Sequence, residues 1–276
     1  MGADELLDRY AAGERNFRNI NLQGATLSGV DLSQAHLRGA NLSETNFTGS
    51  FLKGVNLREA NLSQANFRGT DLREANLINS NLSEVNFSEA NLSDASLRAA
   101  NLGKANLSGT NLTEAILSDA LLRDADLSRA KLIDASLSRT NLAYALLVGT
   151  SMEGANLTHA ILIGANLKGA NLSRAILHTA NFTGANLSQA DLSRAKGTAT
   201  NMADVILKEA NLRGASLSWT TLRGADLTKA NLYRAKLCWS NLSGAILVDA
   251  VLLDANLNQV NWRDANLSGA IMPDGK

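Results

Sequence analysis

Cysteine, proline and aromatic residues are scarce in this sequence. Its 276 residues include one cysteine, one proline and 4% aromatic residues. The single Cys238 excludes an intramolecular disulfide framework and any metal site that needs several cysteines. The low aromatic content is unusual for the core of a conventional mixed domain, so the core has to be built in another way.

An excess of charge of one sign is also lacking. The chain has 26 basic and 26 acidic residues, so its overall charge points neither to nucleic acid nor to a membrane surface. The opening stretch, MGADELLDRY, carries acids where a signal peptide needs a basic flank and an apolar run. We therefore expect a cytoplasmic protein without a membrane partner.

Signatures of chemistry are missing as well. The only histidines are His36, His159 and His178, and no cysteine or carboxylate pair completes a metal site with them. The sequence contains neither GxxxxGK[ST] nor a GxGxxG in a strand-to-helix setting, and no nucleophile–base arrangement can be argued. We expect no enzymatic activity and no cofactor.

A five-residue repeat fills almost the whole chain. From Arg15 to Asp274 the sequence divides into 52 consecutive pentapeptides without an insertion or deletion. The central position, called i here, is Leu in 42 of them and apolar in all but one, which holds Gly197. Position i−2 is Ala in 35, position i−1 is mostly Asn or Asp, and positions i+1 and i+2 are mostly small, polar or charged.

This period fits neither an α-helix nor a flat strand. A five-residue step turns a helix by about 140°, and an odd step sends successive strand side chains to opposite faces. Inward side chains at i−2 and i, followed by a two-residue bend, restore a single inward face. Four such bends of about 90° close a square, so that residue n lies beneath residue n+20 and neighbouring coils pair like parallel strands. We predict an all-β, quadrilateral parallel β-helix of about 13 coils.

The ends of the repeat predict caps, because an open β-helix end exposes unpaired backbone groups. Residues 3–12 are predicted to form a short helix whose Leu6, Leu7 and Tyr10 lie over the first coil. At the other end Trp262 and Met272 replace Leu. The predicted organisation is a capping helix over 1–14, a β-helix over 15–274 and a short tail over 275–276.

The A(N/D)LXX motif, repeated over some 260 residues, resembles the pentapeptide repeat family. The resemblance implies a right-handed quadrilateral β-helix. The end segments ADELLDRYAAGERNF and GAIMPDG are similar to those of cyanobacterial members, including a regulator that suppresses heterocyst formation. That resemblance implies a regulatory role in cell differentiation.

Outward residues 20 apart are expected to form columns. One corner column runs from acidic to basic along the chain, which favours a partner of complementary charge, although solvated side chains explain it as well. The charge asymmetry between the halves supports the first interpretation, with 13 basic and 17 acidic residues in 1–138 and 13 and 9 in 139–276. The column holds Glu74, Asp94, Glu114, Asp134, Gly154, Arg174, Arg194, Gly214 and Arg234.

Outward positions also hold apolar residues, which mark contacts where they are contiguous. The central set is Tyr144, Leu146, Val148, Ile161 and Ile163, and the C-terminal set, which we assign to self-association, is Ile246, Val248, Val251, Leu253 and Ile271. The alternative is that β-branched residues simply suit a strand surface. Trp219 and Trp239, 20 residues apart, are expected to stack on each other and either anchor a partner or pack as surface aromatics.

Two features of the predicted core remain. Phe47, Phe67 and Phe87 occupy one inward column and are expected to form a core ladder rather than a ligand site. Gly197 removes one inward side chain, so either Phe182 and Met202 fill the gap or the wall bulges there.

The sequence thus favours a non-catalytic, rod-like protein that presents flat faces to a protein partner, which the repeat motif does not identify. We expect the protein to be a monomer or a dimer that forms through the C-terminal end. The alternative, implied by other family members, is a mimic of duplex DNA that binds type II topoisomerases, a role at odds with zero net charge. Direct nucleic-acid binding, through Arg174, Arg194 and Arg234 or through Arg18, Arg38, Arg58 and Arg98, is the least favoured.

Overall fold

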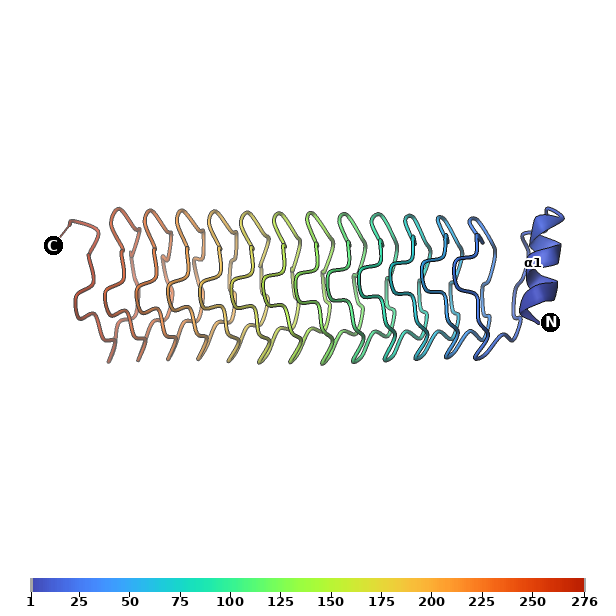
Figure 1. The fold of residues 1–276 in the computed structure, drawn as a ribbon. Coiled ribbons are helices and arrows are strands. Elements are labelled where there is room, and N and C mark those ends of the chain that lie inside the picture. The colour runs from blue at the N-terminus through green and yellow to red at the C-terminus, as the bar shows by residue number, and fades with distance from the viewer. Residues whose placement is uncertain (1, 276) are drawn as a thin grey trace. The chain divides into compact units, whose positions relative to one another are not determined.

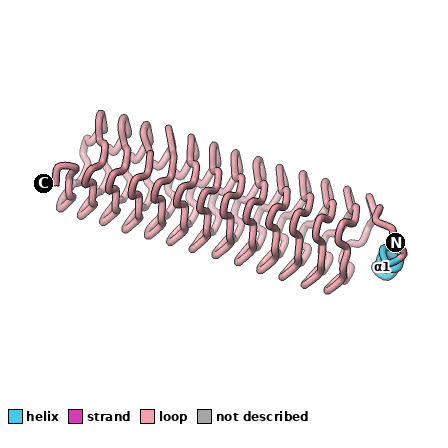
Figure 2. The backbone as a smooth tube through the Cα atoms, turned by 90° about the horizontal axis from the view of Figure 1, so that it is seen from above, coloured by secondary structure: helices cyan, strands magenta, loops and turns pink. Residues whose placement is uncertain are grey.

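The computed structural model describes residues 2–275. Met1 and Lys276, which fall in the predicted capping segment and tail, lie outside the described residues. The chain comprises two compact units, Met1–Ser136 and Leu137–Lys276. Within each unit the backbone runs in coils that stack one upon the next (Figures 1 and 2). The helix α1 (Ala3–Ala11) is the only regular element longer than one residue among the described residues.

A tight turn between each central residue and the next pentapeptide makes the corners of the coils. In the turn after Leu62, the amide of Ala65 donates to the carbonyl of Leu62 at 3.1 Å. The second turn residue, Gln64, has a φ of 59°, and almost every equivalent residue has a φ near +60°. A positive φ at this position alone is the mark of a type II turn. Two residues per corner are therefore enough to redirect the chain.

The stacking register is 20 residues, as the period predicts. Every backbone bridge joins residues 20 apart in parallel, for example Asn61 to Asn81 and Asn181 to Asn201. The pairing nevertheless differs from the parallel strands that the sequence suggested, because each bridge is a single isolated residue at position i−1. Only three residues separate successive two-residue turns, so each ladder is interrupted before it can lengthen into a strand.

The interior of the coils is lined by positions i and i−2, which are fully buried along most of both units. In the first unit Phe47 stacks on Phe67 with ring centroids 4.8 Å apart, and Phe67 stacks on Phe87 at 5.1 Å. The predicted core ladder is thus confirmed. Its spacing matches the roughly 4.8 Å between hydrogen-bonded strands, so each ring fills one layer of the stack.

Buried hydroxyls at position i−2 bond to the carbonyls of the turns. Thr45 Oγ1 donates to the carbonyl of Leu22 at 2.9 Å, and Thr70 Oγ1 donates to that of Phe47 at 2.8 Å. Each carbonyl belongs to the coil before and also closes a turn there. A hydroxyl that reaches such a carbonyl can therefore replace a methyl group in this narrow core without an unsatisfied polar group.

Asparagine at position i−1 holds the outer wall together. Asn61 Oδ1 accepts the amide of Ser63 at 3.3 Å and the side-chain amide of Asn81 at 3.0 Å. The side chain of Asn61 in turn donates to Asn41 Oδ1 at 3.2 Å. Such ladders use both the donor and the acceptor of each amide, and this explains the preference for asparagine at this position.

The helix α1 covers the first coil. Leu6 is completely buried, Leu7 and Tyr10 are half-buried, and Tyr10 donates its hydroxyl to the carbonyl of Ser33 at 2.8 Å. Arg15 lies over the Tyr10 ring with its Cζ 3.8 Å from the centroid. The helix therefore shields the apolar end of the first coil, as its pattern predicts.

The last described coil lacks such a cover. Its inward side chains Leu257, Trp262, Leu267 and Met272 are only half-buried. The last described coil of the second unit thus presents apolar surface.

The Phe ladder makes a direct prediction about stability. Replacing Phe67 by alanine should lower the free energy of unfolding by about 3–5 kcal/mol, because it leaves a cavity between two packed rings. Phe51 provides the matched control, since it lies in the same unit but is 55% exposed. Its replacement by alanine should change stability by less than about 0.5 kcal/mol in urea unfolding. Equal losses for the two variants would contradict the assigned core.

The aspartates at position i−1 predict how stability depends on pH. Hydrogen bonds from Arg73 hold the pKa of Asp71 below its ordinary value of 3.8, and bonds from Ser33 do the same for Asp31. A carboxylate with a lowered pKa in the folded state stabilises the fold at neutral pH, and that contribution is lost as the pH falls below the ordinary value. The free energy of unfolding should therefore decline below about pH 4.

The variant Asp71→Asn tests whether the ion pair with Arg73 causes this pH dependence of stability. The amide oxygen can still accept the backbone amide of Arg73, as Asn61 does for Ser63, so only the ion pair is lost. We expect the variant to be less stable than the wild type by at most about 1 kcal/mol at neutral pH. The difference should shrink in acid. A gap that does not change with pH would refute the ion pair as its cause.

Candidate functional site

The central apolar set forms a contiguous surface in the second unit, here called the central patch. Tyr144 and Ile163 belong to neighbouring coils, and the amide of Tyr144 donates to the carbonyl of Ile163 at 2.9 Å. The Tyr144 ring lies over Gly164, where an added Cβ would come within 2.8 Å of its Cε1. Glycine at 164 therefore lets the ring lie flat against the next coil.

Most of the central patch faces outward, as predicted. Tyr144, Leu146, Val148 and Ile161 are exposed, whereas Ile163 is half-buried. The structure brings all five residues onto two adjoining faces of neighbouring coils. An exposed apolar surface of this kind is typical of a protein contact.

Trp219 and Trp239 stack on each other at the corner of two successive coils. Their ring centroids lie 5.2 Å apart, the planes differ by 5°, and the side chains are 58% and 53% exposed. The predicted stack is confirmed. Because each indole covers one face of the other, the remaining exposure lies on the outer faces and edges, which are open to a partner.

The backbone behind the tryptophans is irregular. Ser240 Oγ donates to the carbonyl of Leu217 at 2.9 Å and accepts the amide of Thr220 at 3.1 Å, so a hydroxyl is inserted into the turn that carries Trp219. The hydroxyl of Thr220 is the one buried side-chain polar atom in the described part of the chain without a partner.

The gap at Gly197 is filled in a way that the sequence did not suggest. An added Cβ there would come within 2.5 Å of Thr200 Oγ1 and 3.0 Å of Leu217 Cδ2. The space is therefore taken by the next i−2 residue and by the neighbouring leucine of the same column, and Phe182 and Met202 are not among the nearest contacts. The turn from Gly197 to Thr200 also lacks its closing hydrogen bond.

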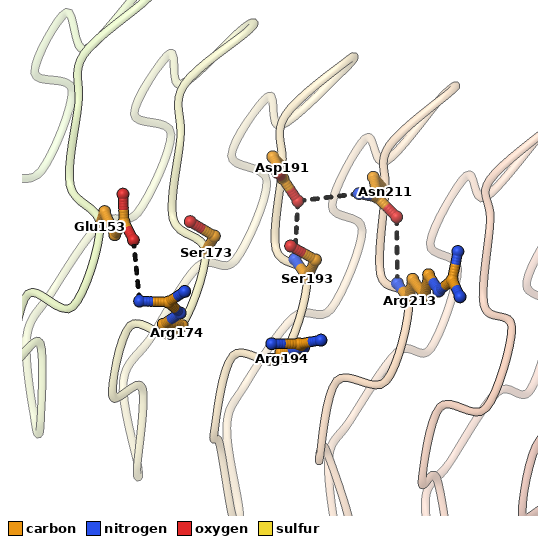
Figure 3. Close-up of a pocket in the computed structure, with 8 residues that line it drawn as sticks. All are labelled: Glu153, Ser173, Arg174, Asp191, Ser193, Arg194, Asn211 and Arg213. Atoms are coloured by element: carbon orange, nitrogen blue, oxygen red, sulfur yellow. Dashed lines mark hydrogen bonds and ion pairs between the residues drawn. The ribbon is translucent and has the colours of Figure 1, made fainter.

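A second surface of the second unit is a shallow hollow of about 350 Å³, open to solvent (Figure 3). Two residues of the predicted basic column, Arg174 and Arg194, lie at the same corner one coil apart. Arg213 joins them from the adjacent column, which the sequence reasoning overlooked because it considered one column at a time. The remaining lining residues are Glu153, Ser173, Asp191, Ser193 and Asn211.

The cations of the hollow differ in how far they are neutralised. Arg174 pairs with Glu153 at 3.2 Å, and Arg234, farther along the column, pairs with Asp254 at 3.2 Å. Asp191 Oδ1 is occupied by the amide of Ser193 at 2.8 Å and by Asn211 Nδ2 at 3.0 Å. Within the described chain, Arg194 has no partner for its guanidinium group.

The acidic residues of the predicted column lie in the first unit and are exposed. Glu74 pairs with Lys53 at 3.1 Å. Asp94, Glu114 and Asp134 have no side-chain partner among residues 2–275. Like charges one layer apart repel weakly in water, so this column is tolerated and does not by itself define a site. In the second basic column, Arg38 and Arg58 both pair with Glu59.

The C-terminal apolar set lies on the coils next to the uncovered end of the second unit. Ile246, Leu253 and Ile271 are exposed, and Val248 and Val251 are half-buried. Ile271 pairs with Val251 through a backbone bridge, so these two side chains belong to one column.

The two histidines of the second unit contact threonine residues. Thr179 Oγ1 lies 2.6 Å from His159 Nδ1, and His178 Nδ1 accepts the amide of Thr198 at 3.1 Å. No cluster of three potential metal ligands occurs within residues 2–275. Over the same range, the structure holds no helix with the length and apolar character to cross a membrane.

These observations define a repeat protein whose side chains line the core of each unit and whose outer faces carry apolar, aromatic and charged surfaces. The family model described as pentapeptide repeats (8 copies) matches most of the chain. The matched residues are 16–54, 52–88, 90–129, 120–158, 135–174, 160–196, 175–214, 206–244 and 245–274. The chain belongs to the pentapeptide repeat family, whose members fold as right-handed quadrilateral β-helices.

Among solved structures, the chain is similar to HetL, a pentapeptide repeat protein involved in heterocyst differentiation regulation from the cyanobacterium Nostoc sp. strain PCC 7120. The identity is 35%, the match covers 100% of this chain and 99% of HetL, and the TM-score is 0.34. It is also similar to alr5209, a pentapeptide repeat protein from Nostoc PCC 7120, with 35% identity over 37% of this chain and 82% of that one, at a TM-score of 0.35.

A more distant match is QnrB1, a plasmid-mediated fluoroquinolone resistance protein. The two sequences are 18% identical, and the match covers 74% of this chain and 92% of QnrB1 at a TM-score of 0.21. A comparison with curated proteins found no match.

Proposed function

We propose that this protein is a non-catalytic interaction protein that binds another protein through the central patch. The observation that carries the proposal is the contiguity of the five apolar side chains on outward positions of neighbouring coils. The Tyr144 ring packs against Gly164 of the next coil, which reduces the side-chain freedom that would be lost on binding.

The proposed role is regulatory and the proposed location is the cytoplasm. The similarity to HetL over the full length of both chains supports regulation of cell differentiation as the process. The stacked Trp219 and Trp239 offer a further anchor in the same unit, since exposed tryptophans are frequent hot spots of protein interfaces.

Affinity capture from a native lysate tests the central patch. We compare the wild type with Leu146→Glu/Val148→Lys/Ile163→Lys. A specific partner should be captured by the wild type and lost by the variant, because charges on the patch would be buried without counterions.

The matched control is Leu121→Glu/Ile116→Lys/Ile206→Lys, which makes the same chemical changes at exposed apolar positions elsewhere. Circular dichroism should be unchanged in both variants. Partners that bind all three proteins equally would show that the central patch is ordinary surface. Recovery of topoisomerase subunits would instead support a DNA mimic, which the zero net charge does not favour.

We also propose that the C-terminal apolar set and the half-buried Leu257, Trp262, Leu267 and Met272 make a contact between two copies of the chain. Exposed and half-buried apolar side chains gathered on neighbouring coils suit a symmetric contact between two copies. Leu253→Glu/Ile271→Lys should shift a dimer to a monomer in sedimentation velocity. A wild type that stays monomeric at high concentration would exclude the contact.

A further inference from the structure

The charge around the hollow extends beyond its lining. Two lysines, Lys196 and Lys236, lie on outward positions two residues beyond Arg194 and Arg234 along their coils. Neither lysine has an ion-pair partner within the described residues. Together with the arginines they form what we call the basic strip: Arg174, Arg194, Lys196, Arg213, Arg234 and Lys236.

Four of the six cations of the basic strip have no ion-pair partner within the described residues. Glu153 and Asp254 occupy Arg174 and Arg234. Arg213 lies over the Tyr233 ring with its Cζ 5.0 Å from the centroid, which orders the guanidinium without neutralising it. Arg194, Lys196 and Lys236 remain uncompensated, and Arg194 reaches the hollow, where hydroxyls of Ser173 and Ser193 supply further donors (Figure 3).

Carboxylates interspersed along the strip restrict the kind of anion. Glu153, Asp191 and Asp254 lie among the cations, so a continuous chain of phosphates would meet negative charge at several points. Acidic side chains of a folded segment can instead meet the cations and avoid the carboxylates. The arrangement therefore favours a protein with spaced acidic residues over a nucleic acid.

The layer spacing points to the conformation of that segment. Successive layers of this unit are about 5 Å apart, as the 5.2 Å between Trp219 and Trp239 shows. Acidic side chains on one face of an α-helix recur at each turn of about 5.4 Å, whereas those on one face of a strand recur at about 6.6 Å. Over the three layers from Arg174 to Arg234, acidic side chains of a helix stay within about 1 Å of the layer positions. Those of a strand deviate by about 4 Å over the same distance.

We infer that the basic strip binds an acidic α-helix of a partner protein, with its glutamate or aspartate side chains on one face and Arg194 at the centre of the contact. The inference rests on the proposed function only in that the partner is a protein. It concerns a different surface from the central patch and predicts the charge and the conformation of the segment bound.

Fluorescence anisotropy with two synthetic helical peptides of identical composition tests the inference. One peptide carries glutamates at i, i+4, i+7 and i+11, and the other distributes them around the helix. The wild type should bind the first peptide at least about tenfold more tightly than the second, and binding should weaken with added salt. Absence of binding, or equal binding of both peptides, would overturn the inference.

Charge reversal locates the site. Arg194→Glu/Lys196→Glu should weaken binding of the first peptide by at least about tenfold. Lys168→Glu/Lys229→Glu is the control, with the same change in net charge at exposed positions outside the strip. Glutamate is tolerated at the backbone conformation of Arg194, since Glu209 has a φ of 56° at the equivalent turn position. Equal weakening in both variants would show a general charge effect and refute the assignment.

Two further measurements distinguish this inference from nucleic-acid binding and from binding at the central patch. Duplex DNA should not compete with the first peptide at moderate salt, and competition would reassign the strip to nucleic acid. Leu146→Glu/Val148→Lys/Ile163→Lys should bind the peptide as the wild type does. Failure of the central patch in affinity capture and failure of the basic strip are therefore distinguishable.

Discussion

Each corner of these coils depends on one residue held in the left-handed backbone conformation. Such a conformation costs about 1 kcal/mol or more for a residue with a side chain, yet 35 non-glycine residues adopt it in the described part of the chain. The cost is offset because the amide of that residue bonds to the next coil, as Gln64 does to Ser83 at 2.9 Å. Corner geometry and stacking therefore stabilise each other.

The sequence predicts the register, the burial and the aromatic stacks, because they follow from the period alone. Phe67 and Trp219 could be placed against their neighbours by adding 20 to a residue number. The one-residue bridges, the hydroxyl of Ser240 inside a turn and the filling at Gly197 could not be predicted, since they depend on distances of a few tenths of an ångström. Arg213 was missed for another reason: it reaches the hollow from a neighbouring column.

The repeat explains why the surfaces are harder to predict than the core. Positions i and i−2 are constrained by packing, whereas i+1 and i+2 need only be compatible with a turn. Position i−1 is held by the asparagine ladder where it is asparagine, but it also accepts other side chains such as Leu146 and Lys196. The central patch and the basic strip use these variable positions on different faces of the second unit. Coils joined by two-residue turns can thus carry two chemically distinct surfaces on their walls.

The register of 20 residues limits how such surfaces can change through insertion or deletion. Gain or loss of a single pentapeptide keeps the core pattern intact but moves every later column of that unit to the next wall, which would separate Arg194 from Arg174. Gain or loss of four pentapeptides keeps every column on its wall and only lengthens or shortens it. Whole coils are therefore the unit in which this protein can grow while it retains a working surface.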